Sequence, residues 1–239
     1  MALCASSAFA FDHQHTFYAG VLEQVVKDGR VDYQRLHDDP GELDRYLDEL
    51  ASVSDRTFGS WTLSQRLSFL VNLHNATVLK MVATRYPVSS FRRVAGMFRD
   101  SWAQPVVRVF ESRITLAALR DNLIRRSYAE PGVHLALCPA ALGGPPLRAE
   151  PYVPERFYEQ IEDQLTKFLA DGRLNRVDQS RNRLYLSPLF RWYEDDFVRR
   201  SGSLVGYLRP FLPDGVGEKV GIRYLSYDWS LNDWKPPGE

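Results

Sequence analysis

The spacing of apolar residues predicts helices along the first third of the chain. Apolar positions recur at helical intervals over residues 13–27, and Gly29 is expected to end that helix. The i, i+3, i+4, i+7 spacing of apolar residues predicts a second helix over 43–50. The first part of the chain is therefore expected to be helical and amphipathic.

A third predicted helix, residues 62–86, is apolar on almost every face. Thr62 and Gln65 are placed to form a capping box at its start, and Pro87 stops it. A helix that is apolar all round is expected to be buried, so its polar side chains must find partners inside the protein or face a pocket. Those polar side chains are Ser68, Asn72, His74 and Asn75.

The remainder of the chain mixes short strands with helices. Strands are predicted over residues 105–110, 133–138, 174–177, 183–186 and 220–224, and helices over 115–126, 157–169 and 187–197. Because helices and strands do not alternate regularly, the pattern favours an α+β fold, with helices around a small antiparallel or mixed sheet. Residues 11–239 are expected to form a single globular domain, since no repeat or low-complexity linker divides them.

Composition and charge narrow the classes of function. The chain is 44% hydrophobic and 25% charged, as in an ordinary globular protein. Lys+Arg and Asp+Glu both total 30, and this balance argues against nucleic acid as the main partner, because phosphate binding favours a basic excess. No stretch approaches the roughly 20 apolar residues of a membrane span, so no transmembrane segment is predicted.

The first ten residues, MALCASSAFA, carry no charge and end in Ala8-Phe9-Ala10. This resembles the cleavage region of a secretory signal, so residues 1–10 are interpreted as the remnant of a signal peptide on a bacterial protein that is periplasmic or secreted. A frayed apolar N-terminus is the alternative interpretation. Removal of Cys4 with the signal would leave Cys138 alone, so no internal disulfide is expected.

Four groups of residues together resemble one family. They are QRLSFLVNLHNA at 65–76, VHLAL at 133–137 with PPLR at 145–148, LSPLFRWY at 186–193, and YDWSLN at 227–232. In this order they are similar to the family called domain of unknown function 547, over about residues 60–234. The resemblance implies a fold related to papain- and transglutaminase-type thiol hydrolases, and it brings no reaction with it.

The chain departs from the family pattern at polar positions. Where the family has V-C-x-x-x-x-C-P-P, Cys138 stands for the valine, Pro139 for the first cysteine and Gly144 for the second. Arg120 also stands where the family tends to have a glutamate. The resemblance therefore identifies a degenerate member that lacks the family cysteines, with the scaffold kept and the chemistry altered.

His134 and Cys138 are the candidate catalytic residues, because a thiolate beside an imidazole makes a strong nucleophile. On the predicted strand 133–138 the two residues would lie about 13 Å apart, which is too far for such a pair. Cys138 is therefore interpreted as a small buried hydrophobe. His134 could still pair with a group elsewhere in the chain.

Candidate ligand-binding residues are Asn72, Asn75, Arg148 and Asp228. Asn72 and Asn75 are neighbours on one helix, so their amides could converge on a ligand or hold a loop in place. Arg148 could clamp a carboxylate or form a salt bridge to Asp196 or Asp228. Asp228 lies between two aromatic residues and is expected to be paired or to cap a turn. Four aromatic residues could line a groove or belong to the core: Trp192, Tyr193, Tyr227 and Trp229.

No metal site and no cofactor are predicted, because the chain has no H-E-x-x-H, Cys–His cluster, phosphate loop, nucleotide fingerprint or G-x-S-x-G motif.

Two functions remain open. One is a non-catalytic binding or scaffold protein that holds a small molecule or a short peptide. The other is an active cysteine-dependent hydrolase or transferase that uses Cys138 or His134. The missing family cysteines favour the first.

Overall fold

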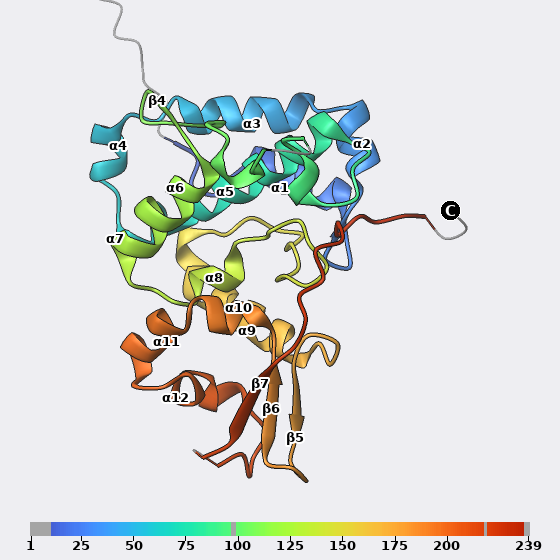
Figure 1. The fold of residues 1–239 in the computed structure, drawn as a ribbon. Helices are drawn as coiled ribbons and strands as arrows, with labels where there is room; N and C mark the ends of the chain where they lie inside the picture. The colour runs from blue at the N-terminus through green and yellow to red at the C-terminus, as the bar shows by residue number, and fades with distance from the viewer. Residues whose placement is uncertain (1–10, 97–98, 218, 237–239) are drawn as a thin grey trace, which may run out of the picture.

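Amphipathic segments build the helical part of the molecule, at the top of Figure 1. The computed structural model describes residues 11–96, 99–217 and 219–236, so the predicted signal remnant, residues 1–10, lies outside the described residues. The first elements are α1 (Thr16–Val25), β1 (Val26–Lys27), β2 (Arg30–Val31), α2 (Tyr33–Asp38), α3 (Gly41–Ala51) and α4 (Asp55–Gly59). Gly29 has a φ of +77° and makes the turn between β1 and β2. The first predicted helix therefore ends earlier than expected, at Val25, and Val26–Lys27 forms a strand instead.

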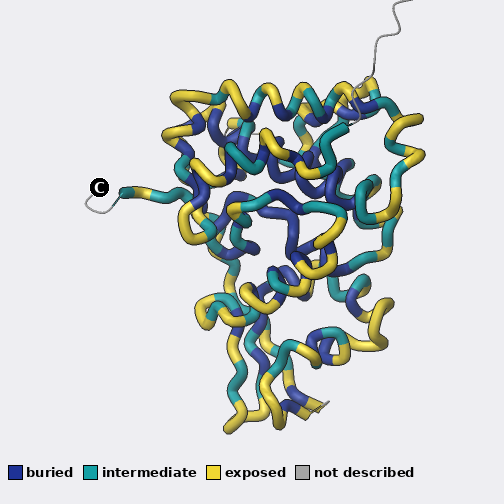
Figure 2. The backbone as a smooth tube through the Cα atoms, turned by 180° about the vertical axis from the view of Figure 1, so that it is seen from behind, coloured by how far each residue is buried: buried dark blue, intermediate teal, exposed yellow. Residues whose placement is uncertain are grey.

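Helix α5 (Leu63–Arg85) forms the centre of this part. The predicted capping box is confirmed, because the Thr62 hydroxyl accepts from the backbone N–H of Gln65 and the Gln65 side chain accepts from the backbone N–H of Thr62. The helix is buried from Leu67 to Leu79, and it packs against α2 and α3. Figure 2 shows it as dark blue chain inside the more exposed helices. Its polar side chains are therefore buried as predicted.

The middle of the chain connects the helical part to the sheet. It contains the hairpin of β3 (Val107–Val109) and β4 (Ser112–Ile114), followed by α6 (Leu116–Ala118), a π-helical stretch (Leu119–Arg125) and α7 (Arg126–Tyr128). Single 3-10 turns occur at Phe91–Arg93 and Ser101–Ala103. The predicted helix over 115–126 is thus confirmed, with its central turns wound more widely than an α-helix.

The predicted strand over 133–138 is wrong. Val133–Ala136 forms a single helical turn, α8, and Leu137 alone returns to an extended conformation. The turn begins in the preceding loop, where the backbone N–H of His134 donates to the carbonyl of Pro131 at 3.2 Å. Apolar residues in a short run suit a buried helix as well as a buried strand, and the local breakers decide between the two.

A mixed sheet forms the opposite end of the molecule, at the bottom of Figure 1. Strand β6 (Arg183–Leu186) pairs antiparallel with β5 (Arg176–Asp178) and parallel with β7 (Gly221–Tyr224). The surrounding elements are a 3-10 turn (Pro154–Arg156), α9 (Phe157–Ala170), α10 (Pro188–Trp192), α11 (Glu194–Ser201), α12 (Leu204–Leu208) and a 3-10 turn (Arg209–Phe211). Ser187 caps α10, because its hydroxyl accepts from the N–H of Leu189. The α+β class and the mixed sheet are confirmed.

The C-terminal segment joins the two ends of the molecule. Figure 1 shows it running from β7 back to the helical part. There Asp233 bridges Val31 in parallel and Leu231 bridges Ala141 in antiparallel register. Two hydrophobic clusters result, a large one around α5 and a smaller one between the sheet and α9–α12. The segments that cross between the clusters carry the side chains of the candidate site.

Candidate functional site

A cavity of about 430 Å³, here called the aromatic pocket, lies where these crossing segments meet. Its aromatic residues are Trp102, Trp192, Tyr193, Tyr227 and Trp229, and its polar residues are Arg92, Arg120, His74 and His134. Leu137, Pro139 and Leu189 complete the lining. The pocket is therefore built from α5, α8, α10, the π-helical stretch, the two 3-10 turns at 91–93 and 101–103, and the C-terminal segment, which are far apart in sequence.

The mouth of the pocket is a cluster of flat aromatic rings. The ring centroids of Tyr227 and Trp229 are 4.4 Å apart, and those of Trp192 and Trp229 are 5.7 Å apart with nearly parallel planes. Trp192 is 46% exposed although it is among the most apolar side chains, so this cluster is not a closed core. An open aromatic surface of this kind can stack on a flat ligand.

Two guanidinium groups give the pocket a positive charge. Arg92 lies over the ring of Trp229, with its central carbon 4.1 Å from the ring centroid. Arg120 lies over Trp102 at 5.2 Å and makes a two-pronged ion pair with Asp121. Among the described residues no carboxylate lies within ion-pair distance of Arg92. Its guanidinium can therefore contact an anionic group on a ligand.

His134 occupies the inner wall of the pocket and pairs with Asp196 of α11. The Nε2 atom of His134 is 2.8 Å from Oδ2 of Asp196, and the ring of Tyr193 stacks on the imidazole at 3.6 Å. The hydrogen bond from His134 and a second from Arg125 hold the pKa of Asp196 well below its usual value. Burial lowers the pKa of His134 despite the carboxylate, so the imidazole is neutral at pH 7.

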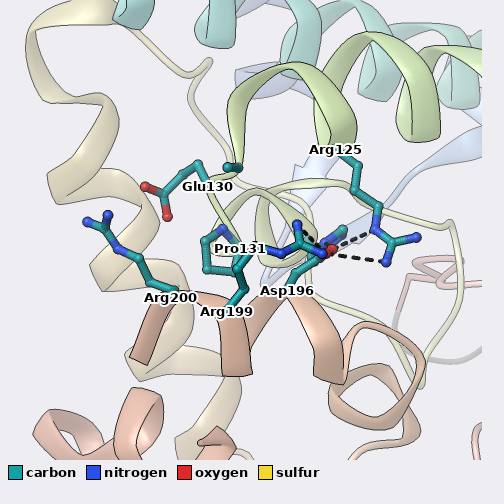
Figure 3. Close-up of a pocket in the computed structure, with 8 residues that line it drawn as sticks. Arg125, Glu130, Pro131, Asp196, Arg199 and Arg200 are labelled. Carbon is teal, nitrogen blue, oxygen red and sulfur yellow. Dashed lines mark hydrogen bonds and ion pairs between the residues drawn. The ribbon is translucent and has the colours of Figure 1, made fainter. Parts of the chain in front are cut away.

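Figure 3 shows the far side of this pair, a smaller cavity of about 220 Å³ in which Arg125 and Arg199 converge on Asp196. Arg125 approaches Asp196 at 2.5 Å, and Arg199 lies 3.7 Å from it. Asp196 therefore takes its two closest partners, His134 and Arg125, from other elements, and Arg199 of its own helix lies farther away. His134 lines both cavities and separates them.

Cys138 lies outside the aromatic pocket. Its side chain is buried, and the amide nitrogen of Asn232 lies 3.7 Å from its Sγ. Burial raises the pKa of the thiol to about 11, so the thiolate is scarce at neutral pH. The next residue, Pro139, lines the pocket instead. The structure therefore does not pair Cys138 with His134.

The two predicted asparagines hold loops in place. The amide of Asn72 accepts from the N–H of Tyr152 at 3.0 Å and donates to the carbonyl of the same residue at 2.8 Å. The amide of Asn75 accepts from the N–H of Cys138 at 2.9 Å and donates to the carbonyl of Ala136 at 2.9 Å. Both amides thus bind the chain's own backbone, and Asn75 fixes the segment that carries His134.

Arg148 and Asp228 also lie away from the aromatic pocket. Arg148 pairs with Glu150 at 2.5 Å and with Asp163, so its partners are neither Asp196 nor Asp228. Asp228 is exposed and accepts from the backbone N–H of Ser230 at 2.9 Å, which is the turn-capping role that its position suggested. Its backbone, rather than its side chain, contacts the loop at Gly143.

Three pocket residues were not among the sequence candidates as ligand contacts: Arg92, Trp102 and Arg120. Arg92 and Trp102 occur in single 3-10 turns, which are too short for the spacing of apolar residues to predict which side chains face the interior. Arg120 was singled out only as a charge reversal against the family pattern, and this signal could have identified it. The four aromatic residues considered for a groove do line one, although Tyr193 also packs on His134.

Within the part of the chain that the structure describes, no group of three or more His, Cys, Asp and Glu side chains could hold a metal ion. No helix among the same residues has both the length and the apolar character needed to cross a membrane. The fold and the site together define an α+β protein with an open aromatic pocket, two arginines and a buried His–Asp pair.

Comparison with known sequences identifies the family. Residues 58–169 match the family described as "Protein of unknown function, DUF547", so this segment of the chain carries the domain of that family. The match includes the segments at 65–76, 133–137 and 145–148, while the predicted resemblance after residue 169 lies beyond it. No curated protein and no solved structure matches the chain.

Proposed function

We propose that the chain is a non-catalytic ligand-binding protein whose aromatic pocket holds a small, flat carboxylate. The observation that supports this most is the composition of the pocket: five aromatic rings and two guanidinium groups around a cavity of about 430 Å³. Aromatic walls recognise a flat apolar body, and a guanidinium recognises a carboxylate. The volume falls within the range of roughly 300 to 1,000 Å³ that small-molecule sites occupy.

The alternative is a cysteine-dependent hydrolase or transferase centred on His134 or Cys138. The hydrogen bond between His134 and Asp196 favours it, because a carboxylate-oriented imidazole is the usual general base of such enzymes. The buried thiol of Cys138, with its raised pKa, argues against it. The relationship to papain- and transglutaminase-type folds belongs to this alternative and is likewise a proposal.

Export to the periplasm or the medium is also proposed, on Ala8-Phe9-Ala10 alone. N-terminal sequencing of the protein purified from the extracytoplasmic fraction tests it. A chain that begins at Phe11 supports export, and an intact Met1 in a cytoplasmic fraction contradicts it.

Thermal unfolding with 2-naphthoate as the probe tests the binding function. A flat carboxylate present at 100 times its Kd should stabilise the protein by about 2.7 kcal/mol, which is a rise in Tm of roughly 5–10 °C for a chain of this size. Arg92→Gln should reduce the rise, because this arginine has an exposed guanidinium over the aromatic cluster.

Arg93→Gln is the matched control, since Arg93 is the exposed neighbour and does not line the pocket. Equal loss of stabilisation in both variants would mean that the probe responds to general surface charge. No shift of Tm with 2-naphthoate at millimolar concentration would contradict the proposed function.

A further inference from the structure

Three arginines lie on one face of the mixed sheet, which forms the bottom of the molecule in Figure 1. The register places Arg176 of β5, Tyr185 of β6 and Arg223 of β7 in one row across the three strands. Arg183 precedes Tyr185 by two residues on β6, so it shares this face. Leu184, between them, points the other way and is buried in the smaller hydrophobic cluster. The three arginines and Tyr185 are here called the arginine face.

The charges of the arginine face are open to solvent. Arg176 and Arg223 are exposed, and the central carbon of the Arg176 guanidinium lies 4.3 Å from the centroid of the Tyr185 ring. Within the part of the chain that the structure describes, no carboxylate lies within ion-pair distance of Arg176, Arg183 or Arg223. Three like charges gathered in a small area create a positive potential that attracts an anionic partner.

The Tyr185 hydroxyl responds to this positive potential. Hydrogen bonding from Arg183, and then from Arg181, lowers the pKa of the Tyr185 hydroxyl. Asp178, the register partner of Arg183, lies 3.8 Å from Arg181. Arg181 therefore balances this carboxylate, and the charges of the arginine face stay uncompensated by the described residues.

We propose that the arginine face is a docking surface for an extended acidic segment of a partner protein. Neighbouring strands lie about 4.8 Å apart, so the row from Arg176 to Arg223 spans about 10 Å between Cα atoms. A strip of this width suits one extended segment, in which side chains that face one side recur about every 6.8 Å. Alternate Asp or Glu side chains of the segment can then accept from successive guanidinium groups. No lining residue of the aromatic pocket belongs to the arginine face, so this surface is independent of the proposed function.

The surroundings of the arginine face favour a narrow partner over a lipid surface or a nucleic acid. Asp178 lies on the same face, and the exposed Asp214 lies beside it in space, because the amide of Gln179 donates to the carbonyl of Asp214 at 3.1 Å. A broad anionic surface would meet these carboxylates together with the arginines, whereas a single segment can pass between them. The whole chain has equal numbers of acidic and basic residues, which disfavours nucleic acid.

Binding of a labelled peptide to the full chain tests the docking surface. The probe is a fluorescein-labelled octapeptide of alternating Glu and Thr, and the matched peptide has Gln in place of Glu. An exposed ion pair changes the Kd about two- to fivefold, so Arg176→Gln combined with Arg223→Gln should weaken binding about 4- to 25-fold. Arg56→Gln combined with Arg113→Gln is the control and should leave the Kd unchanged, because both arginines are exposed and lie in α4 and β4.

The outcomes separate this inference from the alternatives. Equal affinity for the Glu and Gln peptides, an equal loss in both double variants, or absence of binding at millimolar peptide overturns it. Binding to phosphatidylglycerol vesicles or to an oligonucleotide without binding to the Glu peptide overturns the choice of a protein segment. The urea midpoints of both double variants should match the wild type, because only exposed side chains change. The Kd for 2-naphthoate should also be unchanged in both, so failure of this inference leaves the proposed function in place.

Discussion

Replacing Asn75 by alanine tests whether one amide holds the segment that carries His134. The wild-type amide makes three hydrogen bonds, to the N–H of Cys138, to the carbonyl of Ala136 and to Nδ1 of His74. All of these groups are buried. In Asn75→Ala they would lose their partner inside a packed helix, where water has little access.

The expected cost follows from the groups left unpaired. Each buried donor or acceptor without a partner costs about 1–3 kcal/mol, and the contributions of neighbouring groups do not add fully. The two backbone groups and the imidazole of His74 therefore predict a loss of about 3–5 kcal/mol in the free energy of unfolding. Because domains of this kind have a free energy of unfolding of about 5–15 kcal/mol, the variant should still fold but be much less stable than the wild type.

Urea denaturation followed by far-UV circular dichroism measures this loss. The m-value should be unchanged, so that the shift of the midpoint reports stability. Asn122→Ala is the control, because Asn122 is exposed and, among the described residues, its side chain forms a hydrogen bond with Arg126 alone. The loss in this variant should stay below about 0.5 kcal/mol. A loss below about 1 kcal/mol for Asn75→Ala would refute the assigned role.

Three further predictions concern the thiol of Cys138, the buried side chain of Arg148 and the effect of low pH on stability. Cys138 should react with iodoacetamide only after unfolding, because its side chain is buried and its pKa is raised to about 11; rapid labelling of the folded protein at pH 7 would contradict this. Arg148→Ala should lower the stability by about 1–3 kcal/mol through its lost pairs with Glu150 and Asp163, and leave the Kd for 2-naphthoate unchanged. Weaker binding by that variant would restore Arg148 as a ligand contact. Burial lowers the pKa of His74 from 6.5 to about 4, so the unfolded chain binds a proton at His74 more readily than the folded protein does. The contribution of the neutral His74 to the free energy of unfolding is therefore complete above pH 6.5 and is lost as the pH falls toward 4. Urea titrations should show a decrease of about 3 kcal/mol from His74 over that interval, and a stability independent of pH would contradict the burial of a neutral ring.

Local signals in the sequence were sufficient for most helices and for the sheet. The capping box of Thr62 and Gln65 and the end of the first helix before Gly29 depend on neighbouring residues, so the sequence alone predicts them. The burial of α5 followed from its apolar faces. The strand prediction for residues 133–138 was wrong because a run of five apolar residues and His134 has no clear period, and the deciding contact is the turn at Pro131.

The site was less predictable, because its contacts join residues that are far apart in the chain. Asp196 was considered as a partner of Arg148, yet its closest partners, His134 and Arg125, lie in other elements. The guanidinium of Arg148 could bind a ligand carboxylate, but in the structure it already forms an ion pair with Asp163 of α9. The proximity of Arg92 to Trp229 depends on the return of the C-terminal segment, which no local pattern records.

The most direct test of the central claim compares two variants with one ligand. The Kd for 2-naphthoate, measured by quenching of tryptophan fluorescence, should weaken about tenfold in Arg92→Gln, because one charge-assisted hydrogen bond is lost. The same Kd should be unchanged in Cys138→Ser, since the thiol lies outside the pocket. Affinity lost in Cys138→Ser and kept in Arg92→Gln would contradict the account and place the function at the thiol.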